Sequence, residues 1–148
     1  MVPKEIVKFL EAKFKELKKN NGLKALVTAG PTKEFIDPVR YITNKSSGKQ
    51  GYEIAKSLSR RGFDTTLISV PTNLQIDEGI NLIKVETAEE MFKATQKNLP
   101  TDIAVFAAAV GDFKVSHNQK EKIKKLDNFT LKLEKNVDIL NSRPFKRL

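Results

Sequence analysis

The sequence contains no cysteine and a single histidine, His117. The absence of cysteine excludes disulfide bonds, thiolate catalysis and cysteine-ligated metals, and one histidine excludes a histidine-rich metal site. No apolar run approaches the ~20 residues of a membrane span, and the N-terminus lacks the apolar segment of a signal peptide. We therefore expect a protein that does not interact with membranes and that is located in the cytoplasm.

Neither of the two common glycine-rich phosphate fingerprints occurs. The sequence has no G-x-G-x-x-G, and it has no G-x-x-x-x-G-K-[ST] because Lys49 is followed by Gln50. After the second expected strand stands Ser69-Val70-Pro71, where a dinucleotide-binding domain carries Asp or Glu. These absences argue against an NAD(P)-binding Rossmann module, which remains only as an alternative.

Composition indicates one basic domain. The chain has 148 residues, of which 39% are hydrophobic, so it can bury one core. The formal net charge of +9 comes from lysines scattered over helix faces and loops, without the interleaved aromatic residues of a nucleic-acid platform. We expect no nucleic-acid partner. The charge is either solvated surface or a means of attracting small polyanions to a cleft.

Apolar runs that alternate with amphipathic segments predict an α/β fold. The expected architecture is a Rossmann-like, three-layer domain around a parallel sheet with right-handed crossovers and strand order 3-2-1-4. A ligand is expected at the carboxyl ends of the first and fourth strands, where the strand order reverses. The strands are expected at residues 24–29, 65–70, 81–85 and 103–107, and the helices at 48–61 and 88–98.

The chain divides into three segments. Residues 1–22 predict an amphipathic N-terminal helix from Pro3 to Asn20, serving as a packing or connector helix. Residues 23–140 form the domain itself, and residues 141–148 form a C-terminal tail. Within the domain, Phe129, Leu131 and Leu133 alternate with polar residues as in a half-exposed strand. The lysines that precede them indicate either a solvated face or a mobile lysine-rich flap or hairpin.

The segment from Val27 to Gly51 joins the first strand to a helix through a long loop that contains Pro31 and Pro38. Ser46 or Ser47 is the expected helix N-cap. Free N–H groups and the positive end of the helix dipole would then face the loop, as in an anion site. An ordinary βα connection explains the same residues equally well.

The order of residues in this segment is more specific than its predicted secondary structure. Gly30 to Gly51 reads G-P-T-x-E-x-I-D-P-V-R-x-I-T-N-x-S-S-G-K-x-G. This pattern resembles phosphopantothenoylcysteine synthetase, the ligase half of the bifunctional bacterial coenzyme A biosynthesis protein. Ala107–Asp112, Glu121–Lys125 and Leu131–Leu140 resemble further motifs of that family in the same order. The resemblance extends from about Lys24 to Leu140.

The resemblance implies a ligase that joins 4′-phosphopantothenate to cysteine at the expense of CTP, through an acyl-cytidylate intermediate. It implies Mg²⁺ bound mainly by the triphosphate, and no flavin in this chain, because the decarboxylase half is absent. A homodimer or a complementary chain is the expected partner. The domain resembles only the N-terminal part of the ligase, so we expect a sheet that is incomplete at the C-terminus. A non-catalytic or split-subunit nucleotide-binding fragment is the alternative.

The resemblance also assigns roles to residues. Asn44 and Lys122 are the implied catalytic residues. Without the resemblance, Asn44 would more readily be read as a turn or capping residue, and Lys124 is easily confused with Lys122. Ala107 and Ala108 are otherwise core alanines, and Asp112 is otherwise a surface carboxylate. Val137 stands where the family has proline. The implied binding residues are Gly30, Ser46, Ser47, Gly48, Phe106, Ala107, Ala108, Asp112, Lys122, Val137, Asp138, Ile139 and Leu140.

Overall fold

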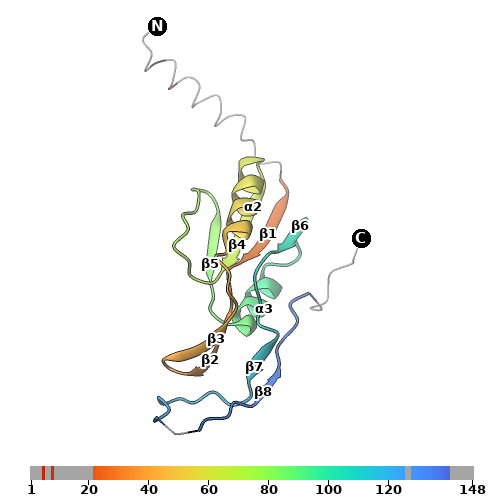
Figure 1. Ribbon diagram of the computed structural model, residues 1–148. Helices are drawn as coiled ribbons and strands as arrows, with labels where there is room; N and C mark the ends of the chain where they lie inside the picture. Colours follow the sequence, from red (N-terminus) through yellow and green to blue (C-terminus); the bar gives the residue numbers. More distant parts are fainter. Residues whose placement is uncertain (1–4, 6–7, 9–21, 126–127, 141–148) are drawn as a thin grey trace.

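A parallel sheet organises the fold of this protein in the computed structural model, which describes residues 5, 8, 22–125 and 128–140. The sheet order is β5-β4-β1-β6, and all three pairings are parallel (Figure 1). In chain order this is 3-2-1-4, so the predicted order is confirmed. The strands are β1 (Lys24–Ala29), β4 (Asp64–Ser69), β5 (Asn81–Lys84) and β6 (Ile103–Phe106).

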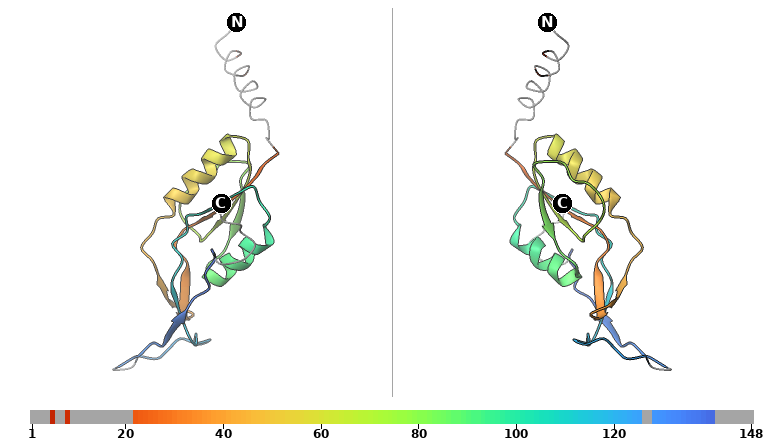
Figure 2. Two further views of the ribbon diagram at one scale, coloured as in Figure 1. Left: turned by 90° about the vertical axis from the view of Figure 1, so that its right-hand side faces the viewer. Right: turned by 90° about the vertical axis from the view of Figure 1, so that its left-hand side faces the viewer.

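Two helices cover opposite faces of this sheet, which confirms the predicted three-layer α/β architecture (Figure 2). α2 spans Lys49–Arg60 and α3 spans Ala88–Lys97. Alternate residues of β1 divide between the two cores, because successive side chains of a strand point to opposite faces. Val27 packs with residues of α2, whereas Leu26 packs with Met91 of α3.

The N-cap of α2 differs from the prediction. Gly48 is the N-cap residue, with φ 74°, and no side chain caps the helix there. Ser46 and Ser47 lie just outside it, where their hydroxyls accept the N–H groups of Gly48 and Lys49, each at 3.3 Å. A left-handed residue is needed at this position, and glycine adopts that conformation at no steric cost.

The expected long loop after β1 contains a β-hairpin, so that part of the prediction was wrong. β2 (Lys33–Asp37) pairs antiparallel with β3 (Arg40–Thr43), with a register shift between Phe35 and Asp37. The rings of Phe35 and Tyr41 meet edge to face across the pair, 5.8 Å apart. Aromatic pairs of this kind stabilise neighbouring strands, which explains why the segment is extended despite its two prolines.

A second hairpin follows β6. β7 (Phe113–Val115) pairs antiparallel with β8 (Leu133–Lys135), and residues 116–132 join them. We call residues 116–132 the lysine loop. The loop and its two strands confirm the expected hairpin, but the strand expected around Phe129 to Leu133 begins only at Leu133. The antiparallel pairing with β7 starts only at Leu133, which is opposite Val115, so the residues before it have no partner in that ladder.

Several sequence expectations lie outside the described residues. The helix expected at residues 3–20 is described only at positions 5 and 8, and the tail of residues 141–148 is not described. In the described part of the chain, none of the helices combines the length and the apolar character needed to cross a bilayer.

Gly51 sets how closely α2 approaches β1. A Cβ atom at this position would lie 2.5 Å from the Cβ of Ala29 and 2.9 Å from the carbonyl oxygen of Thr28. Gly51→Ala gains about 1 kcal/mol of helix propensity, but the overpacking costs more, and we expect a net loss of about 1–2 kcal/mol. Urea unfolding measures this difference. Gln50→Ala, an exposed neighbour in the same helix, is the control; equal midpoints for the two variants would contradict the close packing.

Candidate functional site

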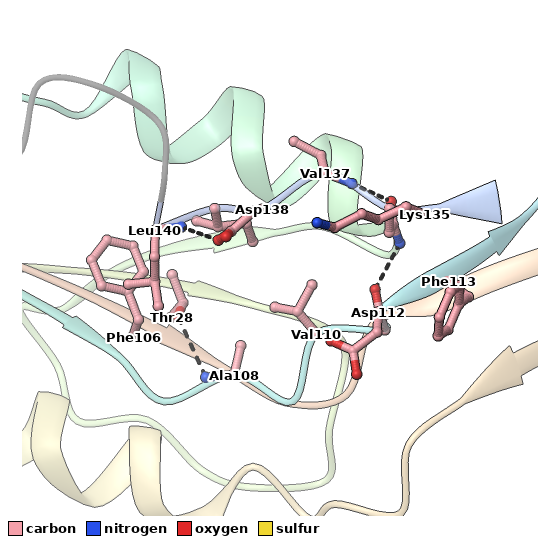
Figure 3. Close-up of a pocket in the computed structure, with 13 residues that line it drawn as sticks. Thr28, Phe106, Ala108, Val110, Asp112, Phe113, Lys135, Val137, Asp138 and Leu140 are labelled. Carbon is pink, nitrogen blue, oxygen red and sulfur yellow. Dashed lines mark hydrogen bonds between the residues drawn. The ribbon is translucent and has the colours of Figure 1, made fainter.

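A cavity of about 500 Å³ opens where β1 and β6 end, at the point where the strand order reverses. Its wall contains Thr28 of β1, Phe106 of β6 and the residues that follow β6 (Figure 3). Cavities at this place in an open parallel sheet are typical ligand sites. The volume lies within the range of small-molecule pockets, which is about 300–1,000 Å³.

One wall is the extended chain after β6. Phe106, Ala108 and Val110 point to the same side, as alternate residues of an extended chain do, and all three line the cavity. The chain is held extended against the end of β1, because Ala109 N–H donates to the Gly30 carbonyl at 3.0 Å. This wall is therefore apolar, and the small side chain of Ala108 leaves room for a flat group.

The opposite wall is the segment after β8, and Asn136 fixes it. Its side-chain amide donates to the Gly111 carbonyl at 3.0 Å, and its backbone N–H donates to the Asp112 carbonyl at 2.8 Å. Beyond it, Ile139 is only 4% exposed and is part of the α3-side core. Asn136 and Ile139 thus attach this segment at two points and leave Val137 and Asp138 over the cavity (Figure 3).

The charged groups of the cavity lie at its rim. Asp112, Lys135 and Asp138 are all exposed, whereas the lining near the sheet is apolar. The Asp138 carboxylate accepts the Leu140 N–H at 3.0 Å, which turns the chain at this point. An apolar cavity floor with a rim of mixed charge suits a ligand that has a flat apolar part and polar substituents.

The structure brings seven of the residues implied by the resemblance into this one cavity. They come from two separate segments of the chain, residues 106–112 and 137–140. The seven are Phe106, Ala108, Asp112, Val137, Asp138, Ile139 and Leu140.

Ala107 does not line the cavity. It lies between Phe106 and Ala108 and therefore faces the other side of the extended chain, while its N–H donates to the Thr28 carbonyl at 3.2 Å. Ala107 therefore extends the pairing with β1 and is not part of the cavity wall.

Gly30, Ser46, Ser47 and Gly48 gather at the start of α2 and do not line the cavity. A Cβ atom on Gly48 would lie 3.1 Å from the Cα and N atoms of Gly30, so the two glycines allow a close backbone approach. The two serines are exposed, and their hydroxyls already accept N–H groups of Gly48 and Lys49. An anion at this helix start would take the place of those hydroxyls.

Asn44 lies behind the cavity wall rather than in it. Its side-chain Nδ2 donates to the carbonyl oxygen of Val110 at 3.2 Å, and Val110 lines the cavity. The residue is exposed and follows β3 directly. Asn44 is thus one hydrogen bond away from the wall, on a side chain whose amide can donate to oxygen.

Lys122 lies in a different part of the structure. It is exposed, and it borders a second cavity of about 510 Å³ formed largely by the lysine loop together with Ile36 and Val115. Lys124 borders the same cavity, so position alone does not separate the two lysines. In the described structure, neither lysine lines the cavity at the ends of β1 and β6.

Sequence reasoning missed six lining residues: Thr28, Val110, Gly111, Phe113, Lys135 and Asn136. Asn136 carried a signal, because a buried asparagine next to a strand must find hydrogen-bond partners. Its partners lie at Gly111 and Asp112, more than 20 positions earlier in the chain, and no local pattern specifies them. Of the other five, Thr28, Phe113 and Lys135 lie in β1, β7 and β8, and Val110 and Gly111 lie between β6 and β7.

No group of three or more His, Cys, Asp and Glu side chains within the described residues is arranged to hold a metal ion. The carboxylates nearest the cavity, Asp112 and Asp138, stand on different segments of its rim.

Comparison with known proteins places the chain in a family. A family model described as the DNA/pantothenate metabolism flavoprotein C-terminal domain matches residues 20–146. The coenzyme A biosynthesis bifunctional protein CoaBC of Haemophilus influenzae is 43% identical over 141 residues, which cover 94% of this chain and 35% of that protein. CoaBC of Mycobacterium bovis is 46% identical over 123 residues, covering 80% of this chain and 29% of the relative. The chain thus spans about a third of the length of these curated relatives.

Comparison with solved structures gives similar folds. The crystal structure of the C-terminal domain of CoaBC superposes with a TM-score of 0.70 at 37% identity, covering 84% of this chain and 58% of that one. A Cab2 mutant in complex with phosphopantothenate-cysteine gives a TM-score of 0.63 at 19% identity, covering 94% of this chain and 65% of that one. The second likeness shows the fold alone. Because the family model matches most of its length, the chain belongs to the family of the DNA/pantothenate metabolism flavoprotein C-terminal domain.

Proposed function

We propose that this domain carries out the CTP-dependent ligation of 4′-phosphopantothenate with cysteine in coenzyme A biosynthesis. The observation that carries the proposal is the cavity at the ends of β1 and β6, where seven residues implied by the synthetase resemblance converge from two separate segments. Family membership supports the same assignment. We also propose a cytoplasmic location, where nucleoside triphosphates such as CTP are available.

The proposed reaction has two steps. A carboxylate oxygen of 4′-phosphopantothenate attacks the α-phosphorus of CTP, the bond to the β-phosphate breaks, and pyrophosphate leaves. The amine of cysteine then attacks the acyl carbon of the acyl-cytidylate, loses a proton, and displaces CMP. Activation is required because a free carboxylate is a poor acyl donor. Mg²⁺ held by the triphosphate oxygens offsets their charge.

The residues contribute binding and orientation. The apolar wall of Phe106, Ala108 and Val110 receives the base, and the segment from Val137 to Leu140 closes over it. Asp112 at the rim faces the polar edge of the nucleotide. The helix start at Gly48, beside Gly30, offers N–H groups to a phosphate once the hydroxyls of Ser46 and Ser47 are displaced.

Asn44 is placed to act on the activated carboxyl group. Its amide now donates to the Val110 carbonyl, which lies in the cavity wall. A neutral donor stabilises oxygen on which negative charge develops, whereas a carboxylate at the same place would repel the anionic substrate.

Lys122 neutralises the phosphoryl group in this proposal, so it must approach the cavity from the lysine loop. Because Lys122 borders a different cavity in the described structure, the loop closes over the site or serves a neighbouring subunit. Exposed apolar side chains on the two hairpins, including Val39, Tyr41 and Phe113, support an association surface for a second copy or a complementary chain. β6 is the outer strand on its side of the described sheet and gives a further edge for association.

The position of Lys122 also supports a second candidate, a nucleotide-binding fragment without turnover. Pyrophosphate release separates the two. The purified protein is incubated with Mg²⁺, CTP and 4′-phosphopantothenate, with and without cysteine. Release of pyrophosphate supports the ligase chemistry, whereas binding of CTP without release supports the non-catalytic fragment.

Lys122→Gln is expected to lower the rate of pyrophosphate release by about 100-fold or more, because it removes a cation from the phosphoryl group in the transition state. Lys124→Gln is the matched control: it removes the same charge two positions away and is expected to keep most of the rate. The reverse ranking of the two variants would transfer the role to Lys124.

Asn44→Asp is expected to leave the fold intact, because the residue is exposed, and to abolish product formation by placing a negative charge beside the anionic substrate. Thermal unfolding and formation of phosphopantothenoylcysteine measure the two effects. Asn81→Asp makes the same chemical change at the amino end of β5, far from the cavity, and is expected to retain activity. Normal turnover in Asn44→Asp would remove Asn44 from the mechanism.

A further inference from the structure

A buried carboxylate at the tip of the β2–β3 hairpin holds the backbone of the lysine loop. Ile123 N–H donates to Oδ2 of Asp37 at 3.1 Å, although 86 positions separate the two residues. Arg40 lies beside them, pairs with the same Oδ2 and donates from Nη2 to the Ile123 carbonyl at 3.3 Å. Both backbone groups of Ile123 are therefore held by one ion pair. Ile123 stands between Lys122 and Lys124.

The two carboxylate oxygens of Asp37 have different tasks. Oδ1 accepts the N–H groups of Val39 and Arg40, each at 2.9 Å, and so shapes the hairpin turn. Oδ2 accepts from the Arg40 guanidinium and from Ile123. Oδ2 thus forms an ion pair with Arg40 across the turn and also holds the lysine loop. The bond to Ile123 is the one that links the hairpin to this loop.

The environment of Asp37 keeps it charged. The side chain is fully buried, whereas that of Arg40 is 44% exposed. Burial by itself would raise the pKa of Asp37, but hydrogen bonds from the N–H groups of Val39, Ile123 and Arg40, together with the charge of Arg40, hold this pKa below its ordinary value. A charged acceptor makes stronger hydrogen bonds than a neutral one, so the loop is held firmly at this point.

The loop has a second attachment on the same strand. Gln119 N–H donates to the Ile36 carbonyl at 2.9 Å. Gln119 and Ile123 flank the position of Lys122, and both contact the end of β2. The backbone on each side of Lys122 is therefore fixed against the hairpin, while the lysine side chain remains exposed.

We propose that Asp37, assisted by Arg40, is a positioning residue that sets where the lysine loop presents Lys122. We call the contacts of the Asp37–Arg40 pair with the Ile123 backbone the clamp. The inference rests on the proposed function for the role of Lys122, but the clamp itself is independent of that function. Asp37 acts through the Ile123 backbone and does not line the cavity at the ends of β1 and β6.

Asp37→Asn separates the two tasks. An asparagine keeps one oxygen for the N–H groups of Val39 and Arg40, but it places an NH₂ group where Oδ2 accepts from Ile123. We expect native-state trypsin cleavage after Lys122 and Lys124 to rise about tenfold, in line with the loss of a charge-assisted hydrogen bond. Cleavage after Lys84 in β5, followed by mass spectrometry in the same samples, reports opening of the whole domain and should not change.

Two further variants keep this experiment decisive. Asp77→Asn breaks the surface ion pair with Arg60 and should leave cleavage at the lysine loop unaltered. Arg40→Lys keeps a cation beside Asp37 but loses the forked reach to the Ile123 carbonyl, so it should raise cleavage less than Asp37→Asn. Unchanged cleavage after Lys122 in Asp37→Asn, or an equal rise after Lys84, would overturn the proposal.

A kinetic measurement extends the test to function. In the pyrophosphate assay, Asp37→Asn should lower kcat while the KM for CTP stays close to that of the unaltered protein, because the cavity lining is untouched. A change confined to KM would overturn the positioning role. If the unaltered protein releases no pyrophosphate, the proposed function fails, and the trypsin comparison still decides whether the clamp exists.

Discussion

The parallel contact between the chain after β1 and the chain after β6 is the constraint on which the rest of the structure depends. The β1–β6 ladder continues past both strands: Ala109 N–H donates to the Gly30 carbonyl at 3.0 Å, and Thr32 N–H donates to the Ala109 carbonyl at 3.1 Å. The buried Thr32 hydroxyl then accepts Gly111 N–H at 2.9 Å. This extension keeps the wall of the cavity straight and brings Val110 to Asn44. It also starts both hairpins from neighbouring points.

The sequence was sufficient to predict the sheet, because each strand is a short apolar run and each crossover contains a helix with a clear apolar stripe. It was insufficient at the β2–β3 hairpin, where Pro31 and Pro38 indicated a loop. The pairing of Phe35 with Tyr41 and the carboxylate of Asp37 make these strands possible, and both are contacts across a turn rather than local preferences. The prediction of a serine N-cap for α2 was wrong for a related reason. The contact between Gly48 and Gly30 selects the capping residue, and it is formed only when the chain has folded.

Only part of the candidate site could be predicted from the sequence. Motif resemblance implied binding roles for residues in 106–112 and 137–140. The structure places members of both segments around one cavity, because these segments follow β6 and β8 and their backbone paths are fixed by the sheet and by Asn136. Resemblance also implied that Asn44 and Lys122 act at one centre, which the described structure leaves as a proposal. Their separation depends on the position of a loop, and loop position is decided by single contacts such as those of Asp37.

These contacts restrict how Lys122 can approach the cavity. The lysine loop is bound to the β2–β3 hairpin at Gln119 and Ile123, so it moves together with the hairpin. The hairpin in turn is bound to the start of α3, where Lys33 N–H donates to the Glu86 carbonyl at 2.8 Å and the buried Glu34 carboxylate accepts Ala88 N–H at 3.1 Å. A closure that carried the hairpin toward the cavity would break both bonds and leave the Glu34 carboxylate unsatisfied, which is costly for a buried charge. In the proposed reaction, Lys122 therefore reaches the cavity either by release of the lysine loop from the hairpin at both Gln119 and Ile123, or from a second subunit whose hairpin is already in place. The second route preserves every contact described within the chain.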